Sequence, residues 1–227
     1  MYTVVGVDFR RMDELRVLTD AGAVTASLLG NGDRVLVLGH GAGGNRGNPF
    51  LLRFARGLAD TGRGVLLFNF PYSEQRRKLP DPPAVLEATV RAVAAEARRR
   101  GARRIALGGK SMGGRIASQA AALGLACDGL VFLGYPLHPP GRTEKLRDAH
   151  LPRVEAPMLF LQGTRDAFAR WDLIEAVTQR LGERARLVRI EDADHSFGVP
   201  KRSGLSPAQV EERLVAETSS WLAEREL

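Results

Sequence analysis

The chain has 227 residues, of which 44% are apolar, with a net charge of +7 at pH 7 and one cysteine. The length favours one domain over residues 1–227, and this apolar content argues against a disordered chain. The sequence has no apolar run long enough to cross a membrane, no signal-peptide pattern at its start and, with Cys127 alone, no internal disulfide, so we expect a cytoplasmic protein.

Strands and helices alternate along most of the chain. Strands are expected at residues 3–9, 15–19, 23–29, 34–39, 65–70, 104–107, 130–134, 158–161 and 185–190. Helices are expected at residues 49–60, 84–100, 115–125, 172–181 and 207–223, with a long polar loop at 71–83. The alternation predicts an α/β fold, in which right-handed crossovers build a mainly parallel sheet with helices on both faces.

Residues 109–113, GKSMG, indicate a nucleophile, because they fit G-x-S-x-G between an expected strand and an expected helix. In that pattern the serine, here Ser111, stands on a sharp turn that lifts its hydroxyl clear of the sheet. A β-carbon at either flanking glycine would collide with a neighbouring strand or helix. The same residues end a phosphate-binding P-loop pattern, but that pattern needs glycine where Arg104 stands. A tight turn with an idle serine is the remaining alternative.

Two further side chains complete a serine-hydrolase set. Asp166 follows the second expected strand after Ser111, and His195 follows the last, so all three lie beyond the carboxyl ends of strands, where ligands bind in open α/β sheets. His195 would take the serine proton, and Asp166 would hold the second ring nitrogen and stabilise the imidazolium. Asp192 and Asp194 share the histidine's own loop and are poorly placed to reach behind the ring. Taken singly, Asp166 could end a turn and His195 could be a surface histidine.

The loop at residues 40–44, HGAGG, is expected to complete an oxyanion hole. The backbone N–H groups of Met112 and Ala42 are the candidate donors. Gly41 and Gly43 let the backbone come close to a substrate. His40 is expected to be structural and to pack beneath the loop.

Two alternative site types find little support. Residues 39–44 also fit the dinucleotide pattern G-x-G-x-x-G, but the next helix starts only near residue 49, and the following strand ends without an acidic residue to hold a ribose. The four histidines show no metal-ligand spacing, and no cysteine pair exists. We therefore expect neither a metal nor a cofactor.

Six segments carry a resemblance to a known family: HGAGG at 40–44, FNFPY at 68–72, GGKSMGGR at 108–115, LGYPLHPPG at 133–141, QGTRD at 162–166 and DHSF at 194–197. With them the chain resembles the α/β-hydrolase superfamily over nearly its whole length. More narrowly it resembles the small dienelactone-hydrolase-like branch, which includes bacterial α/β-family hydrolases and a subunit of the eukaryotic NSL histone-acetyltransferase complex. The resemblance implies the α/β-hydrolase fold and a Ser111, His195 and Asp166 triad without a cofactor. Dienelactone hydrolases proper use a cysteine nucleophile, so their reaction is not implied for Ser111.

The segment at residues 135–156 is short and holds four prolines, which predicts a minimal lid and an open cleft for small, soluble acyl substrates. Basic residues are expected to form a rim around it: Arg46, Arg76, Arg77, Lys78, Arg142 and Lys145. This rim is either a solvated face, which we favour slightly, or a means of recruiting an anionic substrate. Lys110 could add positive potential beside the nucleophile or pair with a buried acid. His138 and His150 could border the pocket, although surface positions are favoured for both.

Two hypotheses about function result. The first is a serine esterase or related acyl hydrolase that forms an acyl intermediate on Ser111 with a small-molecule substrate. The second is a non-catalytic protein-interaction or nucleic-acid-associated module, suggested by the positive charge and by the interaction subunits among the relatives. Its nucleic-acid version is weaker, because four lysines among the 33 basic residues leave 29 arginines, scattered along the chain without interleaved aromatics. No membrane partner is expected, and the oligomeric state stays open.

Overall fold

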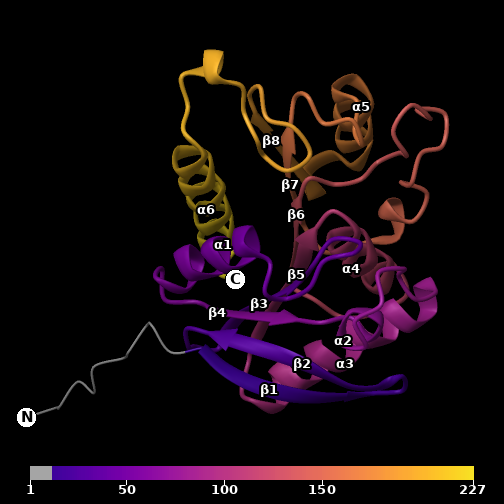
Figure 1. Cartoon of the computed structure of the whole chain (residues 1–227), viewed down its shortest axis with the longest axis vertical. Helices are drawn as coiled ribbons and strands as arrows, with labels where there is room; N and C mark the ends of the chain where they lie inside the picture. The colour runs from indigo at the N-terminus through magenta and orange to yellow at the C-terminus, as the bar shows by residue number, and fades with distance from the viewer. Residues whose placement is uncertain (1–11) are drawn as a thin grey trace, which may run out of the picture.

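A sheet of eight strands runs through the described part of the chain, residues 12–227 of the computed structural model (Figure 1). Its strand order is β1-β2-β4-β3-β5-β6-β7-β8. The strands are β1 (Met12–Thr19), β2 (Gly22–Leu29), β3 (Arg34–Gly39), β4 (Gly64–Phe68), β5 (Arg104–Lys110), β6 (Gly129–Leu133), β7 (Met158–Gly163) and β8 (Ala185–Ile190). The strand expected at residues 3–9 lies outside the described residues.

The sheet is mainly parallel, as the alternation of strands and helices predicted. From β4 across to β8 neighbouring strands pair in parallel, whereas β1 and β2 form an antiparallel hairpin that joins β4 in antiparallel register. β4 and β6 are buried along their whole length, because helices cover both faces of a parallel sheet and leave no side of a central strand to water.

Helices connect the parallel strands. They are α1 (Pro49–Ala59), α2 (Pro71–Glu74), α3 (Pro83–Arg99), α4 (Met112–Ala122), α5 (Trp171–Leu181) and α6 (Pro207–Glu224), with 3-10 turns η1 (Leu151–Arg153), η2 (Gly182–Arg184) and η3 (Lys201–Ser203). α1, α2, α3 and α6 each begin with proline, at a position where a helix has no use for the missing N–H. For the same reason Pro71 opens a short helix inside the segment expected to be loop.

The element boundaries on both sides of the serine differ from the sequence-based expectation. β5 continues to Lys110 and α4 begins at Met112, whereas the strand was expected to end at residue 107 and the helix to begin at 115. Gly108 and Gly109 are poor strand formers by themselves. Their backbones nevertheless pair with β3 on one side and β6 on the other, and this pairing extends the strand.

Two apolar layers hold the helices to the sheet. α1 and α6 cover one face, and α3, α4 and α5 cover the other (Figure 1). Successive strand residues point to opposite faces, so Val35 and Val37 of β3 pack in one layer and Leu36 and Leu38 in the other. The sheet therefore has no solvated face at its centre, and the ends of its strands are the places where an open α/β sheet binds ligands.

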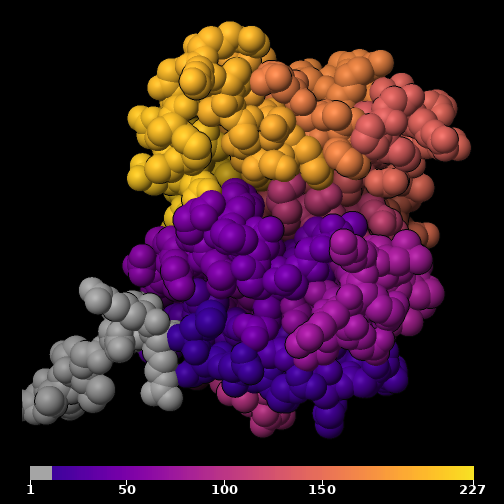
Figure 2. All heavy atoms as spheres, in the orientation of Figure 1, coloured from indigo at the N-terminus to yellow at the C-terminus, as the bar shows by residue number. Residues whose placement is uncertain are grey.

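The carboxyl edge of the sheet carries only a minimal lid. The connection between β6 and β7, residues 134–157, holds no helix beyond the 3-10 turn η1. The first and second halves of the chain occupy opposite halves of the molecule in Figure 2, and β5, which leads to Ser111, lies between β3 and β6 near their boundary. Among residues 12–227, no helix is both long and apolar enough to span a membrane.

Candidate active site

Ser111 stands on a tight turn between β5 and α4. Its backbone has φ of 51° and ψ of −117°, a positive φ that side chains with a β-carbon rarely adopt. The Ser111 N–H donates to the carbonyl of Leu133 at 3.1 Å, and the Ser111 carbonyl accepts from the Arg115 N–H at 3.2 Å. These two bonds fasten the turn to β6 and to the first turn of α4, so the surrounding structure maintains the strained backbone.

Glycines make this turn possible by letting backbones approach one another. A β-carbon at Gly113 would lie 2.3 Å from the carbonyl oxygen of Gly39, and one at Gly109 would lie 2.4 Å from the same oxygen. Both distances are far below van der Waals contact, and both involve backbone atoms that cannot rotate away. The steric role predicted for the two flanking glycines is confirmed.

Gly113→Ala should therefore lower the free energy of unfolding by about 3 kcal/mol or more, the upper range for overpacking, because α4 must move away from β3. Urea unfolding at pH 7 measures this. Gly41→Ala is the matched control, since its β-carbon would meet nothing closer than 3.7 Å and should cost less than about 1 kcal/mol. Equal losses in the two variants would contradict the steric account.

His195 joins the serine to Asp166. Its Nε2 lies 2.8 Å from Ser111 Oγ, and its Nδ1 lies 2.7 Å from Asp166 Oδ2. The Asp166 side chain is fully buried, whereas that of His195 keeps 19% exposure. A carboxylate at this place accepts the Nδ1–H, which leaves Nε2 as an acceptor for the serine hydroxyl. The structure thus brings together the three side chains from three loops.

Asp166 is itself held by two donors. Its Oδ1 accepts from the Phe168 N–H at 2.7 Å, and its Oδ2 accepts from Gln162 Nε2 at 2.5 Å. The Gln162 side-chain oxygen in turn accepts from the Tyr135 N–H at 2.8 Å. These bonds fix the buried carboxylate toward the imidazole and give each of its oxygens a donor.

Asp194 and Asp192 shape the histidine's loop, as the sequence indicated. Asp194 Oδ1 accepts from the N–H groups of Ser196 at 2.8 Å and Gly198 at 2.9 Å. The Asp192 N–H donates to Thr164 Oγ1 at 2.9 Å, which ties the start of the loop to the end of β7. The Asp194 carboxylate therefore acts on the loop backbone and Asp192 contributes its backbone N–H, while the Asp166 carboxylate faces the ring of His195.

The loop after β3 lies against the serine turn. A β-carbon at Gly41 would lie 3.7 Å from the Ser111 β-carbon, so Gly41 lies beside the nucleophile, and Ala42 is the next residue along the chain. The Gly44 N–H donates to the Gly41 carbonyl at 3.1 Å and closes a turn. On the other side, the N–H of Met112 opens α4, where helix N–H groups have no partner within the helix.

His40 holds that loop from beneath, as expected. It is 1% exposed, its Nε2 accepts from the Phe70 N–H at 3.2 Å, and its Nδ1 lies 2.8 Å from the Gly41 carbonyl. Burial lowers the pKa of His40 to about 4, so the ring is neutral and Nδ1 carries the proton. Tyr72 adds a second support, because its hydroxyl accepts from the Gly43 N–H at 3.2 Å.

The sequence analysis did not assign roles to Gln162, Phe168 and Tyr72. The Phe168 ring lies 4.3 Å from the His195 ring, centre to centre, and covers one side of the base. Gln162 and Tyr72 stand inside the segments QGTRD and FNFPY that carried the family resemblance. Those segments were the available signal, but only the contacts show what each side chain does.

Several expected substrate-facing residues are placed differently. His138 is 2% exposed, and both ring nitrogens meet backbone: Nε2 accepts from the Arg170 N–H at 2.9 Å, and Nδ1 lies 2.9 Å from the Pro139 carbonyl. The expected surface position is therefore wrong, and the ring supports the segment that follows Asp166. His150 is also half-buried, with its Nε2 2.7 Å from Ser118 Oγ.

The basic rim is reduced by ion pairs. Arg46 lies in the loop after β3, as expected, but its guanidinium contacts Glu14 at 2.5 Å and hydrogen-bonds Ser27, so its charge is already paired. Arg77 pairs with Asp81 at 2.6 Å. Arg76 is exposed.

Lys110 does not pair with a buried acid, which was one of the two roles expected for it. Its Nζ donates to the His195 carbonyl at 2.5 Å.

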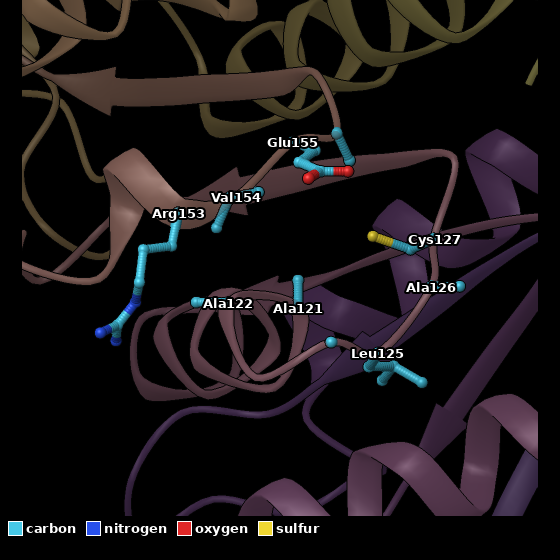
Figure 3. A pocket seen from close by; sticks show the side chains of 10 residues that line it. Ala121, Ala122, Leu125, Ala126, Cys127, Arg153, Val154 and Glu155 are labelled. Atoms are coloured by element: carbon cyan, nitrogen blue, oxygen red, sulfur yellow. The ribbon is translucent and has the colours of Figure 1, made fainter.

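A separate pocket lies at the opposite edge of the sheet (Figure 3). It has a volume of about 430 Å³ between the end of α4 and the segment before β7, and Cys127, Arg153 and Glu155 line it. Burial is the main cause that raises the pKa of the Cys127 thiol to about 11, so the sulfur stays protonated and a poor nucleophile. This pocket offers none of the chemistry gathered at Ser111.

Comparisons with known proteins agree with this architecture. The family model for the alpha/beta hydrolase domain matches residues 32–223. A serine hydrolase without a lid from Xanthomonas campestris superimposes with a TM-score of 0.71 at 22% identity, covering 93% of this chain and 95% of that one. A dienelactone hydrolase from Anabaena variabilis gives 0.72 at 21%, covering 94% and 97%, and Est1E from Butyrivibrio proteoclasticus, solved with ferulic acid, gives 0.73 at 15%, covering 93% and 98%. The fold is that of α/β serine hydrolases and esterases, and the chain belongs to the alpha/beta hydrolase domain family.

Proposed function

We propose that the protein is a serine hydrolase that cleaves small esters or related acyl compounds with Ser111, His195 and Asp166. The observation that carries the proposal is the unbroken hydrogen-bond chain from Ser111 Oγ through the His195 ring to the buried Asp166 carboxylate. Nucleophile, base and orienting acid in this order are the arrangement that activates a serine hydroxyl.

The geometry supports a double displacement. Ser111 Oγ attacks the acyl carbon while His195 Nε2 takes its proton, and the negative charge of the tetrahedral oxygen falls to the N–H groups of Met112 and Ala42. When the tetrahedral species collapses, the alcohol leaves with the proton from His195. Water then attacks the acyl-serine through the same base, and the carboxylic acid is released. Asp166 stabilises the imidazolium in both halves of the reaction.

The proposed substrate is a small, soluble acyl compound. The minimal lid between β6 and β7 supports this, because it provides no large apolar cover for a long chain. With Arg46 and Arg77 ion-paired, electrostatic recruitment of an anionic acyl group rests on Arg76 and the other exposed rim residues. The nucleophile is a serine, so the proposal does not extend to the cysteine-dependent dienelactone reaction.

An activity-based probe tests the proposal. A fluorophosphonate should label the native protein, and peptide mass spectrometry should place the adduct on Ser111. Heat-denatured protein is the control and should not react, because the probe needs the activated serine and not serine alone. A native sample that neither takes up the probe nor hydrolyses p-nitrophenyl acetate above the blank would refute the proposed activity.

A further inference from the structure

Lys110 precedes the nucleophile in sequence, yet its side chain reaches the loop that carries the base. Its Nζ donates to the His195 carbonyl at 2.5 Å and lies 5.5 Å from the centre of the Phe197 ring. Gly134 provides the space, because a β-carbon there would lie 3.1 Å from Lys110 Nζ and 3.5 Å from His195 Nδ1. The ammonium and the imidazole are therefore neighbours across this glycine.

This placement of a cation is costly for the fold. Within residues 12–227, Lys110 forms no salt bridge, so a hydrogen bond to a carbonyl is what replaces its hydration. Lys110 is only partly exposed, and Asp166 and Asp194 attract its charge without reaching salt-bridge distance, so the lost hydration of the ammonium is offset only in part. A methionine of similar length would fill the same space without that cost, which indicates that the ammonium has a task other than stability.

The loop that carries His195 is held by two kinds of hydrogen bond, one within the loop and one to Lys110. Asp194 bonds to the loop's own N–H groups at Ser196 and Gly198, and thus shapes the loop without attaching it to the serine turn. Lys110 makes that attachment, because its backbone ends β5 and its side chain holds the residue that carries the base. Residue 110 therefore precedes the nucleophile along the backbone and holds the base through its side chain.

We propose that Lys110 is a positioning residue, whose ammonium holds the His195 carbonyl and thereby sets the imidazole against Ser111. The inference rests on the proposed function, since it concerns the base of that reaction. A misplacement of about 1 Å at a reacting centre can cost about a hundredfold in rate. A charged donor also makes a hydrogen bond roughly twice as strong as a neutral one, so the clamp requires the protonated lysine.

Protonation of Lys110 gives the clamp a measurable pH dependence. Burial lowers the pKa of Lys110 from 10.5 to about 8, against the charges of Asp166 and Asp194, which face it together with His195. The kcat should fall above about pH 8, as the clamp loses its charge. Stability should change in the opposite direction: between about pH 8 and 10.5 the unfolded chain binds the proton that the folded one has lost, so the free energy of unfolding rises with pH.

Lys110→Met tests the clamp, with Lys201→Met on the exposed turn η3 as the matched control. We expect kcat for p-nitrophenyl acetate to fall about a hundredfold with little change in KM. The fall of activity above pH 8 should disappear, and the variant should melt no lower than the wild type at pH 7. Lys110→Arg keeps a charge and should move the alkaline fall beyond pH 10, since a guanidinium does not deprotonate there. Lys201→Met should behave as the wild type.

A wild-type kcat in Lys110→Met would overturn the proposal, as would a wild-type pH profile that stays flat to pH 10. The second measurement needs no variant. Amide hydrogen exchange of residues 193–198 separates this inference from the proposed function, because it requires no turnover. Faster exchange in Lys110→Met than in Lys201→Met supports the clamp even in a protein that the probe fails to label. Unchanged exchange together with unchanged kcat in a labelled protein rejects the clamp alone.

Discussion

Replacing Ser111 with alanine should lower kcat for p-nitrophenyl acetate about 10⁶-fold, which leaves only what the oxyanion donors and substrate binding contribute. The hydroxyl that lies 2.8 Å from His195 Nε2 is the nucleophile of the proposed reaction, and neither the base nor the acid can act without it. Initial rates of purified protein, corrected for the spontaneous hydrolysis of the ester, measure the effect. Fluorophosphonate labelling should vanish in parallel.

Two controls show whether the loss of activity comes from removing the nucleophile or from damage to the fold. Ser220→Ala changes an exposed serine on α6 and should keep the wild-type rate. Ser111→Cys keeps a nucleophile at the same turn and should still acylate, so a burst of p-nitrophenol is expected without steady turnover of the same size. If Ser111→Ala hydrolysed the ester at a rate within tenfold of the wild type, the nucleophile would have to be another group.

Asp166→Asn should lower kcat about 10⁴-fold, the loss typical of a triad whose acid becomes an amide. The amide has the shape of the carboxylate, so the fold should be kept, although its N–H₂ must face a donor, either Gln162 Nε2 or the Phe168 N–H. It cannot stabilise the imidazolium, however, and its N–H₂ favours the tautomer in which Nε2 carries the proton and cannot accept the one from Ser111. The measurement is kcat together with KM and the unfolding midpoint of each variant.

Asp194→Asn is the matched control for Asp166→Asn. Its side-chain oxygen still accepts from Ser196 and Gly198, now without a charge, so the loop should weaken and kcat should fall about tenfold or less. Asp192→Asn should lower kcat by no more than Asp194→Asn does. The ranking of the three variants decides the acid: a crippled Asp194→Asn beside a nearly normal Asp166→Asn would show that the acid is wrongly assigned even if the serine is right.

The parallel sheet and the three triad candidates could be predicted from the sequence for local reasons. The apolar runs at residues 34–39, 130–134 and 158–161 have no polar alternation, because both faces of their strands are covered. Once the strands are parallel, the residues that follow β5, β7 and β8 must meet at one edge, and this placed Ser111, Asp166 and His195 together. Glycine at positions 109 and 113 indicated the sharp turn, because only a residue without a β-carbon lets the turn approach the backbone of β3 so closely.

Side-chain direction was decided by the tertiary structure. The sequence left the charge of Arg46 free and put His138 at the surface, whereas Glu14 and Ser27 bind the arginine and the backbone of Arg170 and Pro139 holds the histidine inside. Apart from Pro139, these partners lie far along the chain, and no local pattern encodes which of several reachable partners a long side chain takes. The turn around Ser111 could be recognised from its own residues, and Asp166 and His195 were needed to favour a catalytic serine over an idle one. Lys110, one residue before Ser111, could be understood only after the loop of His195 had folded against it, because its bond joins residues 85 positions apart.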